Sequence, residues 1–271
     1  MTKGKKLAVL GAGKMGETLI SGMLDGGIIP RDRIVVTAKH KERLDSLKER
    51  YRITTTLNNR KAVKGAEIVL LAVKPQAVQE LLEEIRGELV REQLVISVVA
   101  SVTTTFIERN LSAPIPVVRA MPNTPCLLRV GMTAICRGTY ADDQNVVETQ
   151  RMFDSVGRTV ILDEKHMDAV TGLSASGPAF MYIIIESLAE AGVKVGLPRA
   201  VATELAAQMT QGAARMVLET KEHPALLKDI VTTPAGCTID GILELEEGKL
   251  RVTLIKAVVK ATQRAAELLE S

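Results

Sequence analysis

The chain has 271 residues, of which 46% are hydrophobic, and a formal net charge of +3 at neutral pH. This length accommodates two domains, since single domains usually contain about 100–150 residues. Tryptophan is absent and aromatic residues make up 2% of the chain. The stacking platforms that single-stranded nucleic acid requires are therefore missing, and no nucleic-acid partner is expected.

The amino terminus passes from lysines directly into a strand-like segment, and no uninterrupted apolar run reaches the roughly 18 residues of a membrane span. We therefore expect a soluble, cytoplasmic protein without a membrane partner. The three cysteines, Cys126, Cys136 and Cys237, have neither an even number nor metal-type spacing. Reduced thiols are expected, and no metal site is predicted.

Strand-like and helical patterns alternate through the first part of the chain. An apolar run at residues 6–10 breaks at Gly11-Ala-Gly13-Lys-Met-Gly16, and helical periodicity follows from Glu17 to Leu24. Such alternation with short connections predicts a parallel, doubly wound sheet with helices on both faces. The next predicted segments are a strand at 34–37, a helix at 41–50, a strand at 68–73, a helix at 75–85 and a strand at 94–99.

The β pattern continues to about residue 162 and then ends. It comprises predicted strands at 116–119, 132–136 and 160–162, with a helix at 143–155. We place the boundary at residue 163, so that residues 1–163 form a Rossmann-like α/β domain and residues 164–271 an all-α domain. The predicted helices of the second domain are 178–193, 199–219, 238–247 and 251–269.

The segment from Ala179 to Ala189 is apolar on nearly every helical face. A helix that packs against one neighbour does not require this, so the segment should be buried all round. About 110 residues cannot easily enclose several such helices. We therefore predict that a partner subunit covers them, in a dimer or a larger assembly.

The motif Gly11-x-Gly13-x-x-Gly16 places small residues where a backbone must turn tightly and approach a pyrophosphate. The motif alone is a weak signal, but its position between the first strand and the first helix favours a dinucleotide site. No acidic residue follows the second predicted strand, where one would bind the ribose of NADH. Because Lys39, His40, Lys41 and Arg43 lie there instead, the sequence favours NADPH, and NADH stays possible.

Reduction of a carbonyl usually needs a proton donor, and only His40, His166 and His223 are available as histidine donors. His40 and His223 are interpreted as surface or capping residues. A cyclic iminium substrate would not need such a donor, because its nitrogen already carries the proton and the positive charge. The loop from Thr232 to Thr238 suits a substrate carboxylate, although spacing alone slightly favours Thr238 as a helix cap over a binding role.

Six motifs, in order along the chain, resemble those of the pyrroline-5-carboxylate reductase family, and the segment from Thr232 to Leu243 completes the family's signature. The motifs are Gly11-x-Gly-x-Met-Gly16, Ala72-Val-Lys-Pro-Gln76, Arg119-Ala-Met-Pro-Asn-Thr-Pro125, Asp168-Ala-Val-Thr-Gly-Leu-Ser-x-Ser-Gly-Pro178, Gly196-Leu-Pro198 and His223-Pro-x-x-Leu-Lys-Asp229.

The resemblance implies NAD(P)H-dependent reduction of 1-pyrroline-5-carboxylate, a small imino acid, to L-proline. It also implies a Rossmann domain followed by a helical dimerisation and substrate-binding domain. The family forms intertwined dimers, sometimes as five dimers in a ring, so a homodimer or a homodecamer is expected. The substrate loop of one subunit would face the cofactor domain of the other.

The resemblance also implies the site residues. The substrate loop would comprise Thr233, Gly236, Cys237 and Thr238, whose backbone N–H groups would hold the carboxylate. The Thr238 hydroxyl would bond the ring nitrogen and is the expected catalytic group, whereas Cys237 would serve through its backbone. The implied cofactor contacts are Gly11, Gly13, Lys14, Met15 and Gly16 at the pyrophosphate, Ala38, Lys39 and Asn59 toward the adenosine, and Ala72, Val73, Lys74, Pro75 and Ala100 toward the nicotinamide.

The chain departs from the family pattern at two glycine positions, where it has Ala175 and Ala235. If Ala235 requires a positive φ, we expect strain of about 1 kcal/mol and a reshaped carboxylate pocket. Ile230 also lies where some members of the family have a polar residue.

Three alternatives are considered beside the main hypothesis. A β-hydroxyacid dehydrogenase is disfavoured, because no Lys-x-x-x-Asn occurs in the helical half. A reductase of another cyclic imine stays open, since ring size depends on pocket shape. A non-catalytic NADPH sensor would have lost the substrate loop, which is intact here.

Overall fold

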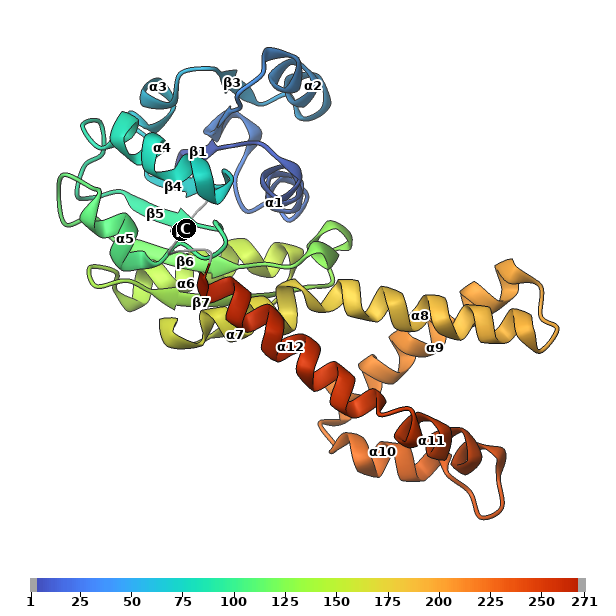
Figure 1. The fold of residues 1–271 in the computed structure, drawn as a ribbon. Helices are drawn as coiled ribbons and strands as arrows, with labels where there is room; N and C mark the ends of the chain where they lie inside the picture. Colours follow the sequence, from blue (N-terminus) through green and yellow to red (C-terminus); the bar gives the residue numbers. More distant parts are fainter. Residues whose placement is uncertain (1–3, 268–271) are drawn as a thin grey trace. The chain divides into compact units, whose positions relative to one another are not determined.

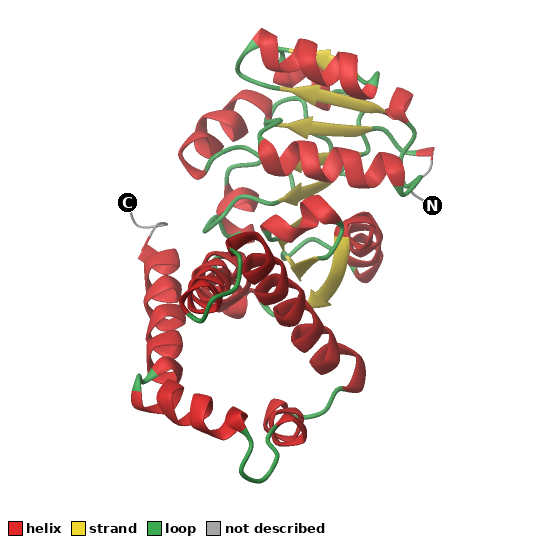
Figure 2. Cartoon of the chain, turned by 90° about the vertical axis from the view of Figure 1, so that its right-hand side faces the viewer, coloured by secondary structure: helices red, strands yellow, loops and turns green. Residues whose placement is uncertain are grey.

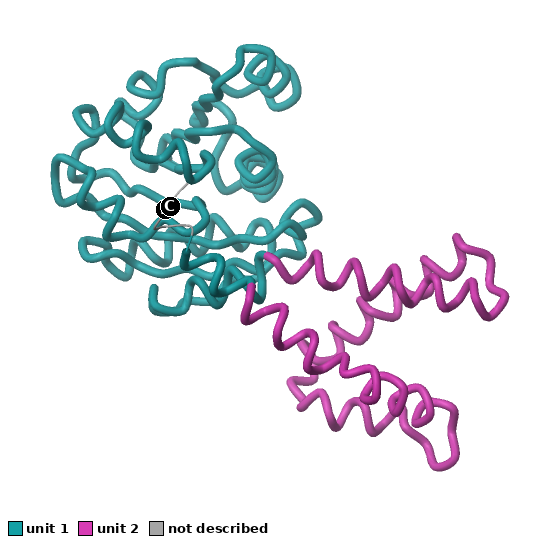
Figure 3. Tube along the Cα trace, in the orientation of Figure 1, with its two compact units in different colours: residues 1–175, 261–271 teal, residues 176–260 magenta. Residues whose placement is uncertain are grey.

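The structure is a computed structural model that describes residues 4–267. The predicted end of the last helix, residue 269, lies outside the described residues. The chain divides into two compact units, residues 1–175 with 261–271 and residues 176–260 (Figure 3).

Unit 1 is built on one eight-stranded sheet in the order β3-β2-β1-β4-β5-β6-β7-β8 (Figure 1). From β1 the chain moves outward to β2 and β3, then returns to β4 on the other side of β1. This reversal makes the carboxyl ends of β1 and β4 the place where an open α/β sheet binds ligands. The strands are β1 (Leu7–Leu10), β2 (Ile34–Thr37), β3 (Thr54–Thr56), β4 (Ile68–Leu71), β5 (Leu94–Ser97), β6 (Val117–Met121), β7 (Gly131–Arg137) and β8 (Gly157–Ile161).

Neighbouring strands are parallel except β6 and β7, which are antiparallel. The sequence-based prediction of a parallel sheet is wrong at this pair. The connection between β6 and β7 contains only the 3₁₀ helix η4 (Thr124–Leu128), whereas a parallel crossover needs a dozen or more residues.

Helices cover both faces of the sheet, as predicted (Figure 2). Leu7 and Val9 of β1 pack with side chains of α1, α2 and α6 on one face, and Ala8 and Leu10 pack with α3, α4 and α5 on the other. Burial on both faces explains the continuous apolar runs of the central strands. The helices of unit 1 are α1 (Lys14–Asp25), α2 (Lys41–Tyr51), α3 (Asn59–Val63), α4 (Val78–Ile85), α5 (Thr104–Arg109), α6 (Asp143–Phe153) and α7 (Met167–Val170), with short helical turns η2 (Arg31–Arg33), η3 (Pro75–Ala77), η5 (Asp154–Val156), η6 (Glu164–His166) and η7 (Thr171–Ala175).

A charged side chain lies within the core of unit 1. Arg119 on β6 is 1% exposed, and its Nη1 lies 3.4 Å from Oε1 of Glu164. The Asp168 carboxylate lies 4.0 Å from Nη2. Glu164 also accepts hydrogen bonds from the backbone N–H and the hydroxyl of Thr104, at 2.7 and 2.6 Å. Glu164 therefore joins η6 to the centre of the sheet and to the first turn of α5.

Unit 2 consists of helices (Figure 3), and these helices have almost no core of their own. Among its residues the only buried hydrophobic side chains are Ala189, Ala202 and Ala206, where α8 packs on α9. By contrast, Ile183 on α8 is 63% exposed within the single chain. The helices are α8 (Gly177–Lys194), α9 (Arg199–Thr220), α10 (Pro224–Val231), α11 (Cys237–Glu247) and α12 (Leu250–Glu267), whose last turns belong to unit 1.

By length and composition alone, the helical stretch Glu164–Lys194 would suffice to cross a membrane. This stretch carries charged residues among its apolar ones, so it is not an uninterrupted apolar run. The same composition suits a helix that packs against a second protein chain.

We expect Glu164→Gln to lower the free energy of unfolding by about 3 kcal/mol, because it leaves the buried Arg119 charge without its nearest counter-charge. Chemical denaturation of the purified variant measures this change. Asp143→Asn is the control, since its carboxylate pairs with Arg137 at 95% side-chain exposure and should contribute less than about 1 kcal/mol. Equal stability of both variants would contradict a structural role for the Arg119–Glu164 pair.

Candidate functional site

The three glycines after β1 have three different surroundings. Gly11 has a φ of +92°, and a Cβ there would lie 2.6 Å from Cγ1 of Val73. A Cβ at Gly16 would lie 2.6 Å from the Gly11 carbonyl oxygen, whereas one at Gly13 would have no neighbour within 4 Å. The turn is thus tight at Gly11, closely packed at Gly16 and open at Gly13, as a dinucleotide-binding turn requires.

The backbone of this turn is held to neighbouring elements, while the start of α1 is free. The Thr37 carbonyl at the end of β2 accepts from the N–H groups of Gly11 and Ala12, at 3.2 and 3.0 Å. The N-cap of α1 is Gly13, which provides no side-chain cap. The first N–H groups of a helix have no intrahelical acceptor, so those of Lys14 to Gly16 are available to an anion.

The residues expected at the nicotinamide end follow β4 and β5. The Ala72 N–H donates to the Leu10 carbonyl at 2.8 Å, which joins this loop to the end of β1. Lys74 and Pro75 begin η3 directly afterwards. Ala100 follows β5 and packs against the cluster that contains Met121. The structure therefore places Ala72 and Val73 against the glycine turn and the others at the ends of adjacent strands.

The residues expected at the adenosine end differ in their surroundings. Ala38 directly follows β2 and packs partly against the core. Lys39 is exposed. Asn59 begins α3, and its side-chain amide donates to the Glu84 carboxylate at 2.7 Å. The Asn59 amide is thus already engaged within the protein.

Glu17, in the first turn of α1, was not singled out from the sequence. Its Oε2 accepts from Nη2 of Arg43 at 2.5 Å, and its Oε1 accepts from Arg50 and from the Tyr51 hydroxyl, each at 3.0 Å. Burial raises the pKa of Glu17, but these hydrogen bonds and the two arginine charges outweigh it, so the pKa lies below its usual value. Glu17 is therefore ionised at neutral pH, and its contribution to stability is lost as the pH falls through that lowered pKa.

The expected substrate loop joins α10 to α11. The Gly236 N–H donates to the Thr233 carbonyl at 3.0 Å, with Pro234 and Ala235 between them. Ala235 has a φ of +55°, so the condition under which the sequence analysis expects strain is met. Proline followed by a residue with positive φ is typical of a type II turn, which explains why glycine would suit position 235.

Gly236, rather than Thr238, is the N-cap of α11. A Cβ at Gly236 would lie 2.5 Å from the Thr233 hydroxyl, so a larger residue here would have to displace the Thr233 side chain. Thr238 lies one residue inside the helix, and its hydroxyl makes no hydrogen bond to any residue in the described part of the chain. The alternative interpretation of Thr238 as the helix cap is wrong.

The three histidines lie in three separate parts of the fold. His223 caps α10, since its Nδ1 accepts from the Ala225 N–H at 3.2 Å, which confirms the capping interpretation. His40 precedes α2 without a side-chain cap, and His166 lies in η6.

All three cysteines are free, as predicted. Burial and the Glu164 charge raise the pKa of Cys136 to about 12, and burial raises that of Cys126. Both therefore stay protonated at neutral pH, while Cys237 is exposed at the start of α11. Residues 4–267 contain no cluster of three potential metal-binding side chains.

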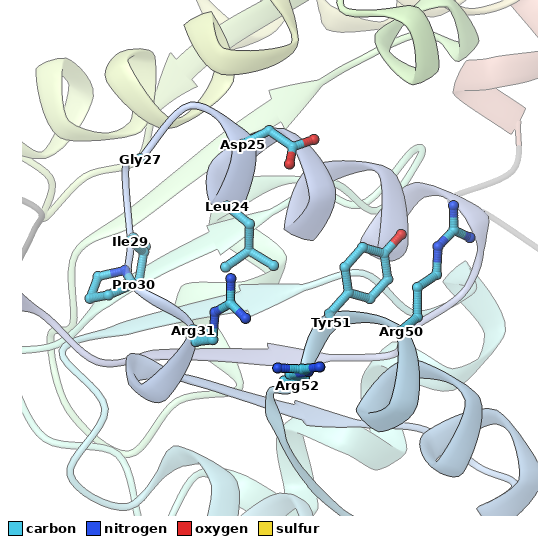
Figure 4. A pocket seen from close by; sticks show the side chains of 9 residues that line it. All are labelled: Leu24, Asp25, Gly27, Ile29, Pro30, Arg31, Arg50, Tyr51 and Arg52. Carbon is cyan, nitrogen blue, oxygen red and sulfur yellow. The ribbon is translucent and has the colours of Figure 1, made fainter.

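Two pockets lie beside α1. One, of about 460 Å³, includes Lys14, Met15 and Thr124 and therefore adjoins the glycine turn. The other, of about 630 Å³, is lined by Arg31, Arg50, Tyr51 and Arg52 among others (Figure 4). Its residues belong to the last turn of α1, to the segment before β2, or to the end of α2 and the residue after it. It therefore lies at the edge where β2 begins, away from the glycine turn.

We expect Gly13→Ala to fold with nearly wild-type stability but to bind a nicotinamide dinucleotide at least about 10-fold more weakly, which corresponds to about 1.4 kcal/mol. The added methyl group meets no protein atom within 4 Å but would occupy the open face of the turn. Fluorescence titration with NADPH and thermal unfolding measure the two effects. Gly16→Ala is the comparison, and should cost about 1–3 kcal/mol of stability through overpacking. Unchanged NADPH affinity in Gly13→Ala would contradict a cofactor role for the turn.

Known families match both halves of the chain. Residues 164–268 match the family model for pyrroline-5-carboxylate reductase dimerisation, and residues 6–101 match a model described as NADP oxidoreductase coenzyme F420-dependent. The first match begins at Glu164, the residue that pairs with Arg119.

Similar proteins match over nearly the whole length. A pyrroline-5-carboxylate reductase of Corynebacterium melassecola is 38% identical, with 97% of this chain and 98% of that protein covered. The solved structure of a Coxiella burnetii pyrroline-5-carboxylate reductase superimposes with a TM-score of 0.91 at 36% identity, covering 97% and 98% of the two chains. A Plasmodium falciparum pyrroline carboxylate reductase, solved with NADP bound, gives a TM-score of 0.89 at 28% identity, covering 99% and 100%.

The similarity extends over the full length of the chain and agrees with the glycine turn in unit 1 and with the nearly coreless helices of unit 2. The chain belongs to the pyrroline-5-carboxylate reductase family.

Proposed function

We propose that this protein reduces 1-pyrroline-5-carboxylate to L-proline, with NADPH as the hydride donor. The observation that carries the proposal is the dinucleotide-binding turn together with full-length similarity to pyrroline-5-carboxylate reductases. NADP is bound in the related Plasmodium falciparum structure. The missing acid after β2 supports NADPH, although use of NADH stays open.

The residues around the turn fit such a cofactor. Gly13 leaves open space in front of α1, and the helix presents N–H groups and its positive dipole end to a pyrophosphate. Lys14 and Met15 would flank the phosphates, and the loop from Ala72 to Pro75 would line the ribose next to the nicotinamide. When bound, the reduced cofactor supplies a hydride.

The protein needs no strong acid for this reaction. A protonated cyclic imine already carries its proton and positive charge on nitrogen, which makes the adjacent carbon electrophilic. Positioning the two reactants in a water-excluded site then provides most of the acceleration, and aligned reactants gain on the order of 7–11 kcal/mol. The capping role of His223 and the high pKa of the buried thiol of Cys136 agree with this mechanism.

The loop from Thr233 to Thr238 would bind the substrate. Because Gly236 caps α11 without a side chain, the N–H groups of the first turn are free for the substrate carboxylate. The Thr238 hydroxyl, which has no described protein partner, would hydrogen-bond the ring nitrogen and orient it. Cys237 would contribute its backbone N–H.

The proposed activity is tested by NADPH oxidation with several substrates side by side. Oxidation with 1-pyrroline-5-carboxylate but not with 2-oxo or 3-oxo acids is expected. Faster reduction of the six-membered homologue would reassign the substrate to another cyclic imine. Binding of NADPH without turnover of any substrate would favour a sensor and overturn the proposed activity.

We also propose that the protein acts as a homodimer or as a pentamer of dimers in the cytoplasm. The similarity of residues 164–268 to a dimerisation domain and the exposed apolar side chains of unit 2 support the dimer. The pentamer and the location rest on the family resemblance alone.

Thr238→Ala should reduce kcat/KM for 1-pyrroline-5-carboxylate by roughly 10- to 150-fold, the equivalent of one hydrogen bond to a charged group. NADPH affinity should stay nearly unchanged, and Thr238→Ser should recover much of the loss. Steady-state kinetics and thermal unfolding are measured for both variants. Thr253→Ala, which removes a helical hydroxyl bonded to the Lys249 carbonyl, is the control. Wild-type kinetics in Thr238→Ala would refute the assignment.

Ile183→Asp should prevent assembly and greatly reduce activity, because an unpaired carboxylate in an apolar interface is strongly unfavourable. Ile183 is 63% exposed in the single chain, so the fold of each chain should be little affected. Analytical ultracentrifugation measures the assembly. Val90→Asp, at a 54% exposed position between α4 and β5, serves as the control. A fully active monomer would contradict the proposed dimer.

A further inference from the structure

One side chain ties the glycine turn to α2. The Arg43 Nε–H donates to the Ala12 carbonyl oxygen at 2.8 Å. Among the residues that the structure describes, Arg43 is the only one whose side chain bonds the backbone of residues 11–13. Arg43 therefore belongs to the turn, although it lies 31 residues away from Ala12 in the sequence.

Glu17 fixes the orientation of the Arg43 guanidinium. Nη2 of Arg43 donates to Oε2 of Glu17 at 2.5 Å, and the other Glu17 oxygen is held by Arg50 and Tyr51. The Arg43 guanidinium is thus held at two nitrogen atoms. The glycine turn binds Nε, and the Glu17 carboxylate, which is itself fixed, binds Nη2. Two arginines and one glutamate leave this cluster with one excess positive charge.

Arg43 keeps donors that the protein does not use. A guanidinium has five N–H groups, and the two bonds to Ala12 and Glu17 occupy two of them. The remaining three, including both on Nη1, bond no residue in the described part of the chain. The Arg43 side chain is 33% exposed, so these donors can reach a bound anion.

The position of Arg43 matches one end of the cofactor. It is the third residue of α2, which begins four residues after the end of β2. The ribose that carries the 2′-phosphate of NADPH lies at this end of the second strand in dinucleotide-binding folds. Lys39 and Lys41 lie nearby, but both are exposed and neither pairs with a described residue. Ordering a free lysine on a phosphate costs side-chain entropy that the fixed Arg43 has already lost.

We propose that Arg43 is the residue that selects NADPH over NADH, holding the glycine turn with Nε while its free N–H groups bind the 2′-phosphate. Glu17 is its positioning residue. The inference rests on the proposed use of NADPH and goes beyond it, because one guanidinium then couples the 2′-phosphate to the turn that binds the pyrophosphate.

The test uses the full-length protein and two nucleotides that differ in one group, adenosine 5′-diphosphate with and without a 2′-phosphate. Isothermal titration calorimetry gives the ratio of their dissociation constants, independently of catalysis. Arg43→Met should reduce the preference for the 2′-phosphate by about 10- to 150-fold. It should also weaken binding of the nucleotide without the 2′-phosphate several-fold, because the glycine turn loses its hydrogen bond from Arg43.

Three further variants separate the possible causes. Lys39→Met removes the same charge from an unpaired side chain among the implied adenosine contacts, and should reduce the preference less than Arg43→Met does. Arg43→Lys keeps the charge but cannot bond two protein groups and a phosphate together, so it should lose most of the preference. Glu17→Gln should weaken 2′-phosphate binding, although the loss of a nearby negative charge alone would strengthen it.

The assignment would be overturned if Arg43→Met kept the wild-type preference for the 2′-phosphate, or if Lys39→Met lost more of that preference than Arg43→Met. If Arg43→Lys kept the full preference for the 2′-phosphate, charge alone would suffice. This result would refute the simultaneous contact of Arg43 with the glycine turn and the phosphate. Tighter 2′-phosphate binding in Glu17→Gln would refute its positioning role. If the wild-type protein bound neither nucleotide, the proposed NADPH dependence would itself fail, which is a separate result.

Discussion

The close approach between the glycine turn and the loop after β4 is the constraint on which the site depends. Gly11 turns with a φ of +92°, and its Cα faces Val73 at a distance that leaves no room for a Cβ. The Ala72 N–H simultaneously bonds the Leu10 carbonyl. The carboxyl ends of β1 and β4 are thereby joined where the strand order reverses. Any side chain at Gly11 would push apart the two elements that a dinucleotide must span.

Unit 2 depends on a different constraint, the lack of a core. Three alanines form the buried contact between α8 and α9, and Gly192 permits it, since a Cβ there would lie 2.9 Å from the Ala202 Cβ. Small side chains allow close helix packing but bury little apolar area, and burial stabilises by only about 25 cal/mol per Å². The large apolar side chains of unit 2 point elsewhere and need a second surface. The proposed dimer would provide that surface, so we expect dimerisation and folding of this unit to be coupled.

The predicted elements with strong periodicity or continuous apolar runs are present, because burial on both faces of the sheet determines such patterns. The elements that the sequence analysis missed are short. Strand β3 consists of three threonines at the edge of the sheet, and α3 and α5 contain five and six residues. The N-caps of α3 and α5 could have been recognised in the sequence, because the side chains of Asn58 and Thr103 accept the hydrogen bonds that begin these helices. The sequence of β7, which is antiparallel to β6, shows no pattern that differs from that of a parallel strand.

The site was predictable where it depends on backbone conformation. The glycine spacing indicated the turn, and the departure from the family pattern marked Ala235 as a position where a positive φ would matter, because both depend on the backbone freedom of glycine. The Glu17 cluster was not predictable, since its partners come from a different helix and their spacing has no local period. Long-range pairs of charged residues require the fold before they can be identified.

The Glu17 cluster also resolves an electrostatic conflict at the start of α1. A carboxylate in the first turn of a helix is favourable for the helix dipole but repels a pyrophosphate at the same terminus. The conflict disappears when Arg43 and Arg50 more than neutralise the carboxylate, as they do here. The helix keeps its favourable acidic residue, and the net charge of the cluster turns positive toward an anionic cofactor. Because Arg43 also bonds the Ala12 carbonyl, the neutralising charge lies next to the turn itself, where its attraction for phosphate is strongest.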